Sequence, residues 1–181
     1  MNNRLCISGK GVNMKRSIAL PLILAAATAH AVQPADPVRL DEVVERGSKV
    51  MTFDLDKTLH IFDKTETGGI QQVIVKDEAD SEQIALIRQH LTEIAGRFAQ
   101  GDFSGPIQIH GNDMPGVKEL SAGAARVRFA YRDLPNGGQI EFGADAPELV
   151  AAIHRFFDAQ LRDHARHAMP GGHAQHHGHQ P

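Results

Sequence analysis

The chain has 181 residues, with 19 basic and 22 acidic residues, a formal net charge of −3 and one cysteine. This length is enough for one domain with short extensions. The slightly acidic balance argues against nucleic acid or an anionic lipid surface as a partner, because phosphate binding requires clustered positive charge.

The first 31 residues have the features of a cleavable secretory signal peptide. Met14-Lys15-Arg16 is a short basic segment, and the apolar run that comes next, Ser17 to Ala27, is too short to span a bilayer stably. Ala29-His30-Ala31 has small residues where signal peptidase cleaves. We therefore expect cleavage after Ala31, a mature form without a membrane span, and a periplasmic or secreted location.

Cleavage would remove the only cysteine, Cys6, so a transition-metal site in the mature chain would use imidazole, carboxylate or thioether ligands. We expect residues 32–47 to be a linker that ends in a turn or short helix. Residues 48–167 are expected to form a single domain, and residues 168–181 a disordered histidine-rich tail.

The first half of the domain predicts two strands and a helix. Apolar and polar residues alternate from Met51 to Ile61, which predicts a strand with one buried face. Thr67-Gly68-Gly69 predicts a turn, and residues 70–75 the return strand. Asp80 and Gln83 then form a capping-box pattern, and the apolar stripe of the helix after it ends near residue 101.

The second half predicts the same order again. A short strand is expected at 106–109 and a Gly- and Pro-rich loop at 110–116. Residues 126–133 alternate, Pro135-Asn136-Gly137-Gly138 predicts a hairpin, and residues 139–142 return. Asp145 and Glu148 form a second capping-box pattern before a helix from about 146 to 165.

Each expected helix has a histidine near its middle, His90 and His154. We therefore predict an α+β fold built from tandem ββα units, with an antiparallel sheet and two helices on one face. The repeat is explained either by a duplication or by the commonness of this arrangement in small α+β layers.

Residues 53–59, Phe-Asp-Leu-Asp-Lys-Thr-Leu, resemble the first motif of the haloacid dehalogenase-like phosphatases, Asp-x-Asp-x-Thr after a hydrophobic strand. The resemblance implies Asp54 as nucleophile and Asp56 as general acid and base, with Mg²⁺ between them. The alternative is that Asp54, Asp56 and Thr58 line the solvent side of an antiparallel strand, because the preceding residues alternate rather than being continuously apolar.

Histidine is the second chemical signal. Ten of the eleven histidines come after Ala31, and neutral imidazole is a common ligand of Zn²⁺ and Cu²⁺. His154 and Asp158 are four apart on a helix and can reach the same side. His110 and Met114 share a loop, and a thioether beside an imidazole suits copper. The candidate ligands in the domain are His60, His110, Met114, His154, Asp158 and His164. For each of them ordinary packing is the alternative explanation.

The tail places four histidines in seven residues, His173, His176, His177 and His179. A segment of this composition is expected to bind a divalent ion at neutral pH, whatever its role. A solvating tail without a metal role is the alternative.

The stretch from about Met51 to His167 resembles a group of small exported bacterial proteins that are often named aspartate carbamoyltransferase. The resemblance lies in segments such as 58–62, 68–71, 87–91, 109–116 and 153–164. A carbamoyltransferase needs a Ser-Thr-Arg-Thr phosphate loop, which this chain lacks. The resemblance therefore implies export and a fold rather than that activity.

These features together predict an exported protein that handles copper or zinc through histidine and methionine ligands, and not an enzyme. One alternative is an exported Mg²⁺-dependent hydrolase that uses Asp54 and Asp56. Another is a non-catalytic module that binds a second periplasmic protein through Arg126, Arg128 and Arg132, which share one side of their strand. Charge pairing across the sheet, with Asp54 and Asp56 among the partners, would also explain these arginines.

Overall fold

The computed structural model describes residue 1 and residues 32–172. The chain divides into two units, residues 1–30 and 31–181, and every described helix and strand lies in the second. The predicted signal peptide, beyond Met1, and the four tail histidines lie outside the described residues.

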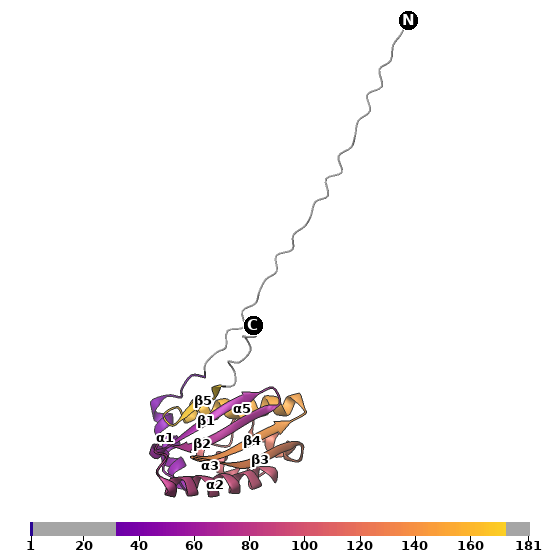
Figure 1. The fold of residues 1–181 in the computed structure, drawn as a ribbon. Coiled ribbons are helices and arrows are strands. Elements are labelled where there is room, and N and C mark those ends of the chain that lie inside the picture. Colours follow the sequence, from indigo (N-terminus) through magenta and orange to yellow (C-terminus); the bar gives the residue numbers. More distant parts are fainter. Residues whose placement is uncertain (2–31, 173–181) are drawn as a thin grey trace. The chain divides into compact units, whose positions relative to one another are not determined.

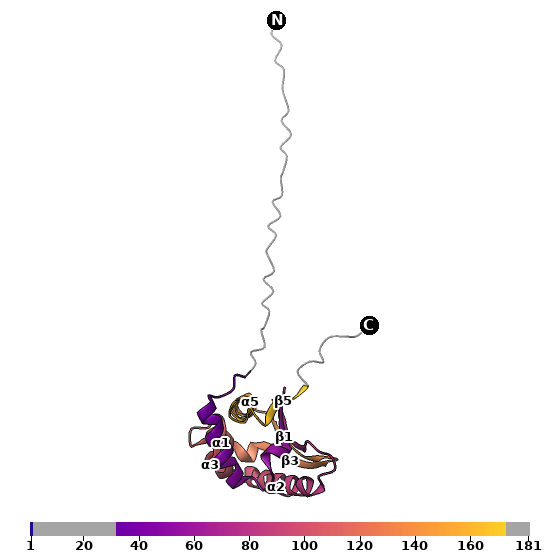
Figure 2. The same ribbon diagram turned by 90° about the vertical axis from the view of Figure 1, so that its left-hand side faces the viewer.

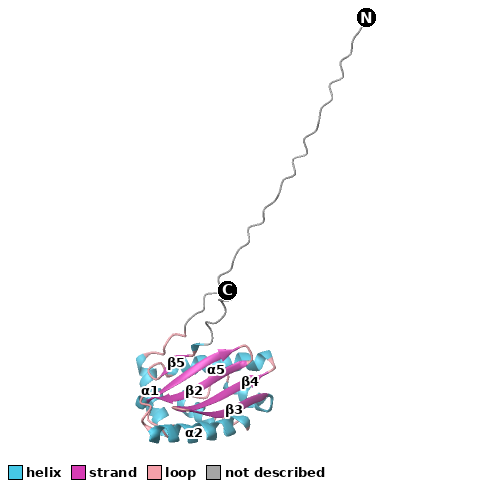
Figure 3. Ribbon diagram, viewed as in Figure 1, coloured by secondary structure: helices cyan, strands magenta, loops and turns pink. Residues whose placement is uncertain are grey.

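The described chain has five α-helices, two 3₁₀ turns and five strands (Figures 1 and 3). The helices are α1 (Pro37–Val50), α2 (Ser81–Ala99), α3 (Ser104–His110), α4 (Val117–Gly123) and α5 (Pro147–Asp163). The strands are β1 (Thr58–Thr65), β2 (Gly68–Val75), β3 (Val127–Leu134), β4 (Gly137–Ala144) and β5 (Ala168–Pro170). The 3₁₀ turns η1 (Leu55–Lys57) and η2 (Ala124–Arg126) directly precede β1 and β3.

The strands form one sheet in the order β3-β4-β2-β1-β5. The neighbours among β1 to β4 are antiparallel, and Gln71 of β2 lies opposite Ile140 of β4 at the centre of the sheet. The last strand, β5, pairs parallel to β1, with His60 opposite Ala168. The α+β class with two ββα units is thus confirmed, but the sheet is mixed because the chain returns along β1 after α5.

The long helices α2 and α5 lie on the same face of the sheet (Figure 2). Two glycines on that face make room for them. A Cβ at Gly69 would lie 2.5 Å from a ring carbon of Phe157, and one at Gly138 would lie 3.1 Å from a methyl of Leu91. The core forms between these helices and the sheet, where the largest side chains are phenylalanines: Phe62, Phe98, Phe103, Phe142, Phe156 and Phe157.

The helix expected at the end of the predicted linker, residues 32–47, is α1, but it begins already at Pro37 and belongs to the domain, so the linker is shorter than predicted. Asp36 caps the helix by accepting a hydrogen bond from the backbone N–H of Arg39, and Pro37 occupies its first turn. Val43 is fully buried. The tail likewise starts later than predicted, because residues 168–170 are strand β5.

Two predicted strands are also corrected. The alternation from Met51 does not mark a strand up to Thr58, because Asp54 caps the turn η1 by accepting from the N–H of Asp56. Residues 106–109 belong to helix α3, where Pro106 occupies the first turn and so removes no intrahelical hydrogen bond.

Of the two predicted helix caps, one is confirmed and one is wrong. Asp80 accepts from the backbone N–H of Gln83 at the start of α2, as predicted. The reciprocal half of the capping box does not form, because the Gln83 side chain accepts from the N–H of Asp54 and the N–H of Asp80 donates to Asp77. Helix α5 begins instead at Pro147, with Ala146 at the cap position and no side-chain cap. Proline at the first helical position removes one of the N–H groups that have no intrahelical acceptor, and its fixed φ suits the start of a helix.

Candidate functional site: a buried histidine cluster

Three histidines from distant parts of the sequence meet beneath the sheet. His60 lies on β1, His110 ends α3, and His164 comes directly after α5. The rings of His60 and His164 stack with centroids 5.7 Å apart, and the rings of His110 and His164 meet edge to face at 4.9 Å. All three residues are at most 7% exposed. Three of the predicted metal ligands are therefore brought together.

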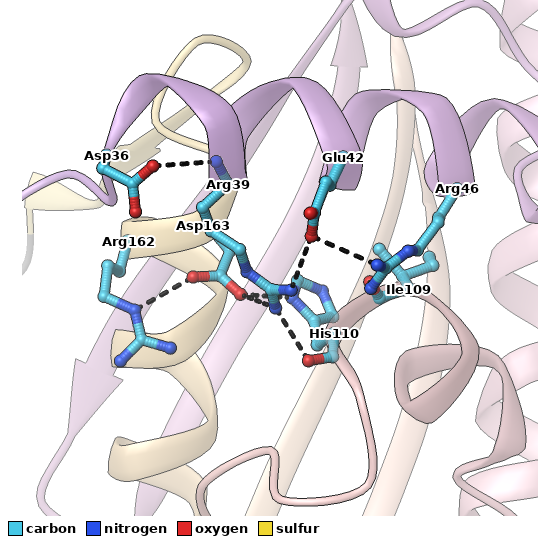
Figure 4. A network of polar contacts seen from close by, with 8 residues as sticks. All are labelled: Asp36, Arg39, Glu42, Arg46, Ile109, His110, Arg162 and Asp163. Atoms are coloured by element: carbon cyan, nitrogen blue, oxygen red, sulfur yellow. Dashed lines mark hydrogen bonds and ion pairs between the residues drawn. The ribbon is translucent and has the colours of Figure 1, made fainter.

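Asp163, the last residue of α5, orients His110 (Figure 4). Its carboxylate lies 2.9 Å from Nδ1 of His110 and 2.7 Å from the guanidinium of Arg39. Arg162 donates to the other carboxylate oxygen at 2.9 Å. Because a carboxylate only accepts hydrogen bonds, Nδ1 of His110 carries the proton that it donates to Asp163, and Nε2 is the nitrogen left outside this contact.

Asp163 is charged although its side chain is only 1% exposed. Burial by itself raises the pKa of this carboxyl. The hydrogen bonds from His110, Arg39 and Arg162 outweigh burial and hold the pKa well below its usual value. Arg39 also donates to the backbone carbonyl of His110 at 2.7 Å, so α1 ties the end of α3 to the end of α5.

Ring nitrogens of the cluster lack hydrogen-bond partners among the described residues. They are Nδ1 of His60, Nε2 of His110, and both nitrogens of His164. A buried polar atom without a partner costs on the order of 1–3 kcal/mol. Burial lowers the pKa of His60 to about 4, and that of His164 well below its ordinary value. These rings are therefore neutral at physiological pH, and their lone pairs are shielded from solvent.

The rings do not converge on one point. Among residues 32–172, no group of three or more His, Cys, Asp or Glu side chains is placed so that it could hold a metal ion. The rings of His60 and His164 are nearly parallel, at 6°. The cluster in this conformation is thus a set of neighbouring potential ligands rather than a formed coordination site.

A small pocket of about 40 Å³ opens beside the cluster. Its walls are mainly apolar, with side chains such as Leu91 of α2, Ile109 of α3 and Phe53 of the segment between α1 and η1. His60 and His110 reach it from the cluster side, and Gln71 and Gln160 line it as well.

The remaining predicted ligands in the domain have other partners. Nε2 of His154 lies 3.0 Å from the carbonyl oxygen of Thr65 and 2.9 Å from that of Gly68, so it donates to the β1–β2 turn. Asp158 forms an ion pair with Lys64. His154 and Asp158 thus reach the same side of α5, as expected, but there each side chain contacts the β1–β2 hairpin.

Met114 is 5% exposed and belongs to the hydrophobic core. Its thioether packs among apolar side chains, as the alternative explanation of this residue predicts.

The aspartates of the phosphatase-like motif do not lie where that chemistry needs them. Asp54 and Asp56 precede β1 instead of coming after a strand, and β1 pairs antiparallel with β2. Asp56 accepts from Nε2 of His167 at 2.9 Å. Asp54 and Asp56 are exposed to solvent, as the alternative predicts, but they lie at the turn η1 and not on a strand. Thr58 is fully buried and donates to the carbonyl of Asp54, so its predicted solvent-facing position is wrong.

Each of the three arginines at β3 forms an ion pair or a hydrogen bond with a nearby side chain. Arg126 pairs with Glu148 and Arg128 with Glu141, and Arg132 donates to Gln139. Charge pairing across the sheet is thus confirmed for Arg128, whereas Arg132 bonds the neutral amide of Gln139. Asp54 and Asp56 are not among the partners, because β3 lies at the opposite edge of the sheet from the β1 side.

Four residues near the cluster were not predicted from the sequence to act there: Arg39, Gln71, Gln160 and Asp163. Gln71 leaves a signal, because it interrupts the apolar side of β2 that carries Val73 and Val75. Arg39 leaves none, since its partner Asp163 lies 124 positions away.

Comparisons with known proteins found no matching protein-family model, no matching curated protein and no matching solved structure. Within the described part of the chain, every helix is too short or too polar to cross a membrane.

Proposed function

We propose that this chain is an exported protein that binds copper or zinc, with His60, His110 and His164 as the ligands of the domain and Asp163 as the group that orients His110. The observation that carries the proposal is the meeting of three buried rings whose nitrogens lack partners among the described residues. Buried polar atoms in native proteins are nearly always paired, so such a cluster calls for a ligand that supplies the missing interactions.

The protonation states favour a metal ion as that ligand. Imidazole binds a metal only when neutral, and burial lowers the pKa of His60 and of His164. The contact between Asp163 and Nδ1 of His110 is the arrangement that fixes a metal-binding histidine and leaves Nε2 for the ion. Because the three rings do not converge, binding requires at least one imidazole to turn about its side-chain torsions.

Export and a role for the tail rest on the sequence. The signal-peptide pattern supports a periplasmic or secreted location, and the four tail histidines would capture the ion or pass it to the cluster. The hydrolase alternative is not proposed, because Asp54 and Asp56 lie in a turn before β1.

The test is calorimetric titration of residues 32–172 with Zn²⁺, Cu²⁺ and Cu⁺ after treatment with a chelator. This fragment lacks the tail histidines and keeps β5, which pairs with β1. One stoichiometric site is expected, and His110→Gln or His164→Gln should abolish it. His90→Gln is the matched control, since His90 is a buried histidine beside the same pocket whose ring meets that of Phe53.

If residues 32–172, which lack the tail, bind no ion, the proposal for the domain is overturned. The three histidines would then be packing residues. Retention of the site in both cluster variants would show that the ion binds elsewhere.

A further inference from the structure

A fourth buried histidine, His167, is held against the cluster by its backbone. Its carbonyl oxygen accepts from the N–H of His60 at 2.8 Å, and its own N–H donates to the carbonyl of His164 at 2.8 Å. Burial lowers the pKa of both these neighbours most, and the surrounding histidines, His167 among them in each case, lower it further. The side chain of His167 therefore also lies close enough to act on the two stacked rings.

A carboxylate at the surface holds the ring of His167. Asp56 lies 2.9 Å from Nε2, and its side chain is 90% exposed, whereas that of His167 is 8% exposed. Because a carboxylate only accepts hydrogen bonds, Nε2 carries the proton that it donates to Asp56, and Nδ1 is the nitrogen left outside this contact. Nδ1 is buried and has no hydrogen-bond partner among the described residues.

His110 shows the same arrangement with the two nitrogens exchanged. Asp163 contacts its Nδ1 at 2.9 Å, and its Nε2 is buried without a partner among the described residues. A carboxylate on one ring nitrogen is a usual partner of a metal-binding histidine, because it fixes the ring and leaves the other nitrogen for the ion. Asp56 and Asp163 are therefore equivalent groups, one for His167 and one for His110.

The second ββα unit shows what ordinary packing places at the equivalent positions. Phe129 of β3 stands 69 positions after His60, as β3 stands after β1. Phe98 lies at the end of α2, as His164 lies at the end of α5. The ring centroids of Phe98 and Phe129 are 5.9 Å apart, close to the 5.7 Å between His60 and His164. Apolar rings therefore fit this arrangement, and the imidazoles add nitrogens that packing does not need.

We propose that His167 is the fourth ligand of the ion site, that Asp56 is its positioning residue, and that the four imidazoles form a closed site for Zn²⁺. This inference rests on the proposed ion site and names its remaining ligand and its ion. Zn²⁺ in closed protein sites is almost always bound by four ligands in a tetrahedron. The rings must turn about their side-chain torsions to converge, as they must for three ligands. Four protein ligands leave no position for a substrate, so the site holds its ion and does not use it in catalysis.

The first test is titration of Zn²⁺ against a chromophoric chelator on residues 32–172, which contain every described helix and strand. Asp56→Ala should weaken binding by about 10- to 100-fold, and His167→Gln by more, because it removes a ligand. The urea unfolding of ion-free Asp56→Ala should be nearly unchanged, since this carboxylate is exposed. Asp41→Ala is the matched control: Asp41 is an exposed carboxylate that pairs with Arg166, the residue before His167, and its removal should leave affinity unchanged.

Two spectroscopic readings separate a ligand from a structural residue. Zn²⁺ should shift the Nδ1 signal of His167 in imidazole NMR spectra and leave the ring of His154 unchanged, because that ring binds the β1–β2 turn. Co²⁺, as a substitute for Zn²⁺, should give the intense visible bands of a four-coordinate ion.

The outcomes distinguish this inference from the proposed function. If residues 32–172 bind no ion at all, both are overturned. If Zn²⁺ binds but the Nδ1 signal of His167 does not move, or both variants keep full affinity, His167 and Asp56 are removed from a site that otherwise stands. Weak visible bands of six-coordinate Co²⁺ would overturn the closed four-imidazole site.

Discussion

Arg88 and His154 hold equivalent positions in the two ββα units and make equivalent contacts. Arg88 on α2 donates to the carbonyls of Leu134 and Gly137 at the β3–β4 turn. His154 on α5 donates to those of Thr65 and Gly68 at the β1–β2 turn. The helix residues are 66 positions apart and the turn residues 69. Each helix therefore anchors the hairpin of the other unit through one polar side chain. The residue of α2 that corresponds to His154 of α5 is Arg88, and not His90.

This relationship predicts that His154 is a structural residue. His154→Ala leaves two turn carbonyls without their donor and should lower the free energy of unfolding by about 1–2 kcal/mol, measured by urea titration. Ion binding should not change. Arg155→Ala is the control, because Arg155 pairs with exposed Glu119 and should have little effect. Loss of ion affinity with unchanged stability would instead assign His154 to a metal site.

Gln71 gives a second prediction from the same symmetry. Gln71→Ile repeats the residue found at the equivalent position, Ile140, and removes an amide oxygen that has no partner among the described residues. The free energy of unfolding should rise by about 1 kcal/mol in the absence of ligand, because an unsatisfied buried polar atom is replaced by an apolar one. A fall in stability would mean that the Gln71 amide is fully paired in the free protein.

The third prediction concerns two glycines, Gly96 on α2 and Gly68 on β2. Gly96 is exposed within the helix, and a Cβ there would meet nothing within 4 Å. Gly96→Ala should therefore stabilise the fold by about 0.5–1 kcal/mol, since alanine is the better helix former. Gly68→Ala should be strongly destabilising, because its φ is +146° and its Cβ would lie 2.0 Å from the carbonyl oxygen of Phe142. Thermal unfolding of both variants checks the contrast.

Much of the fold can be predicted from local patterns in the sequence. The Gly-Gly turns, the strands after them and the apolar stripes of α2 and α5 all depend on neighbours within a few residues. Helix α1 and strand β5 do not. The buried face of α1 is defined by α3 and α5, and three-residue β5 is held by its pairing with β1. Helix α3 has seven residues, too few for a period to show.

The site can be predicted by residue type but not by arrangement. His60, His110 and His164 are candidates because imidazole is a metal ligand, and nothing in their spacing shows that they meet. Their meeting depends on the end of α5 lying beside β1 and α3, which is set by tertiary packing. The carboxylate partner is misassigned from sequence for the same reason: Asp158 faces Lys64, and Asp163 faces His110.

Asp163 carries the fourth prediction. Asp163→Asn removes the charge that holds His110 and should weaken ion binding to residues 32–172 by about 10- to 100-fold. It also leaves Arg39 without its buried anionic partner, so the free energy of unfolding should fall by about 3 kcal/mol. Asp158→Asn on the same helix is the matched control and should change neither quantity much, because its ion pair with Lys64 is exposed. Unchanged ion affinity in Asp163→Asn would remove Asp163 from the site.

The buried histidines predict how the stability of the metal-free protein depends on pH. Burial, and then the neighbouring His90 and His167, lower the pKa of His60 to about 4 in the fold, against an ordinary value near 6.5 in the unfolded chain. Above pH 6.5 the ring is neutral in both states and contributes nothing. As the pH falls from about 6.5 to 4, the unfolded chain binds a proton that the fold does not, so stability is lost.

The loss from His60 alone should approach about 3 kcal/mol near pH 4, and His164 adds to it in the same direction. Asp163 acts in a lower window, because its depressed pKa gives stability that is lost only below about pH 4. Urea unfolding of chelator-treated protein at pH 7, 6, 5 and 4.5 measures the slope, and His60→Gln should flatten it. Imidazole NMR signals give an independent reading: a His60 ring that titrates near pH 6.5 would show that it is solvated, and the buried neutral cluster would not exist.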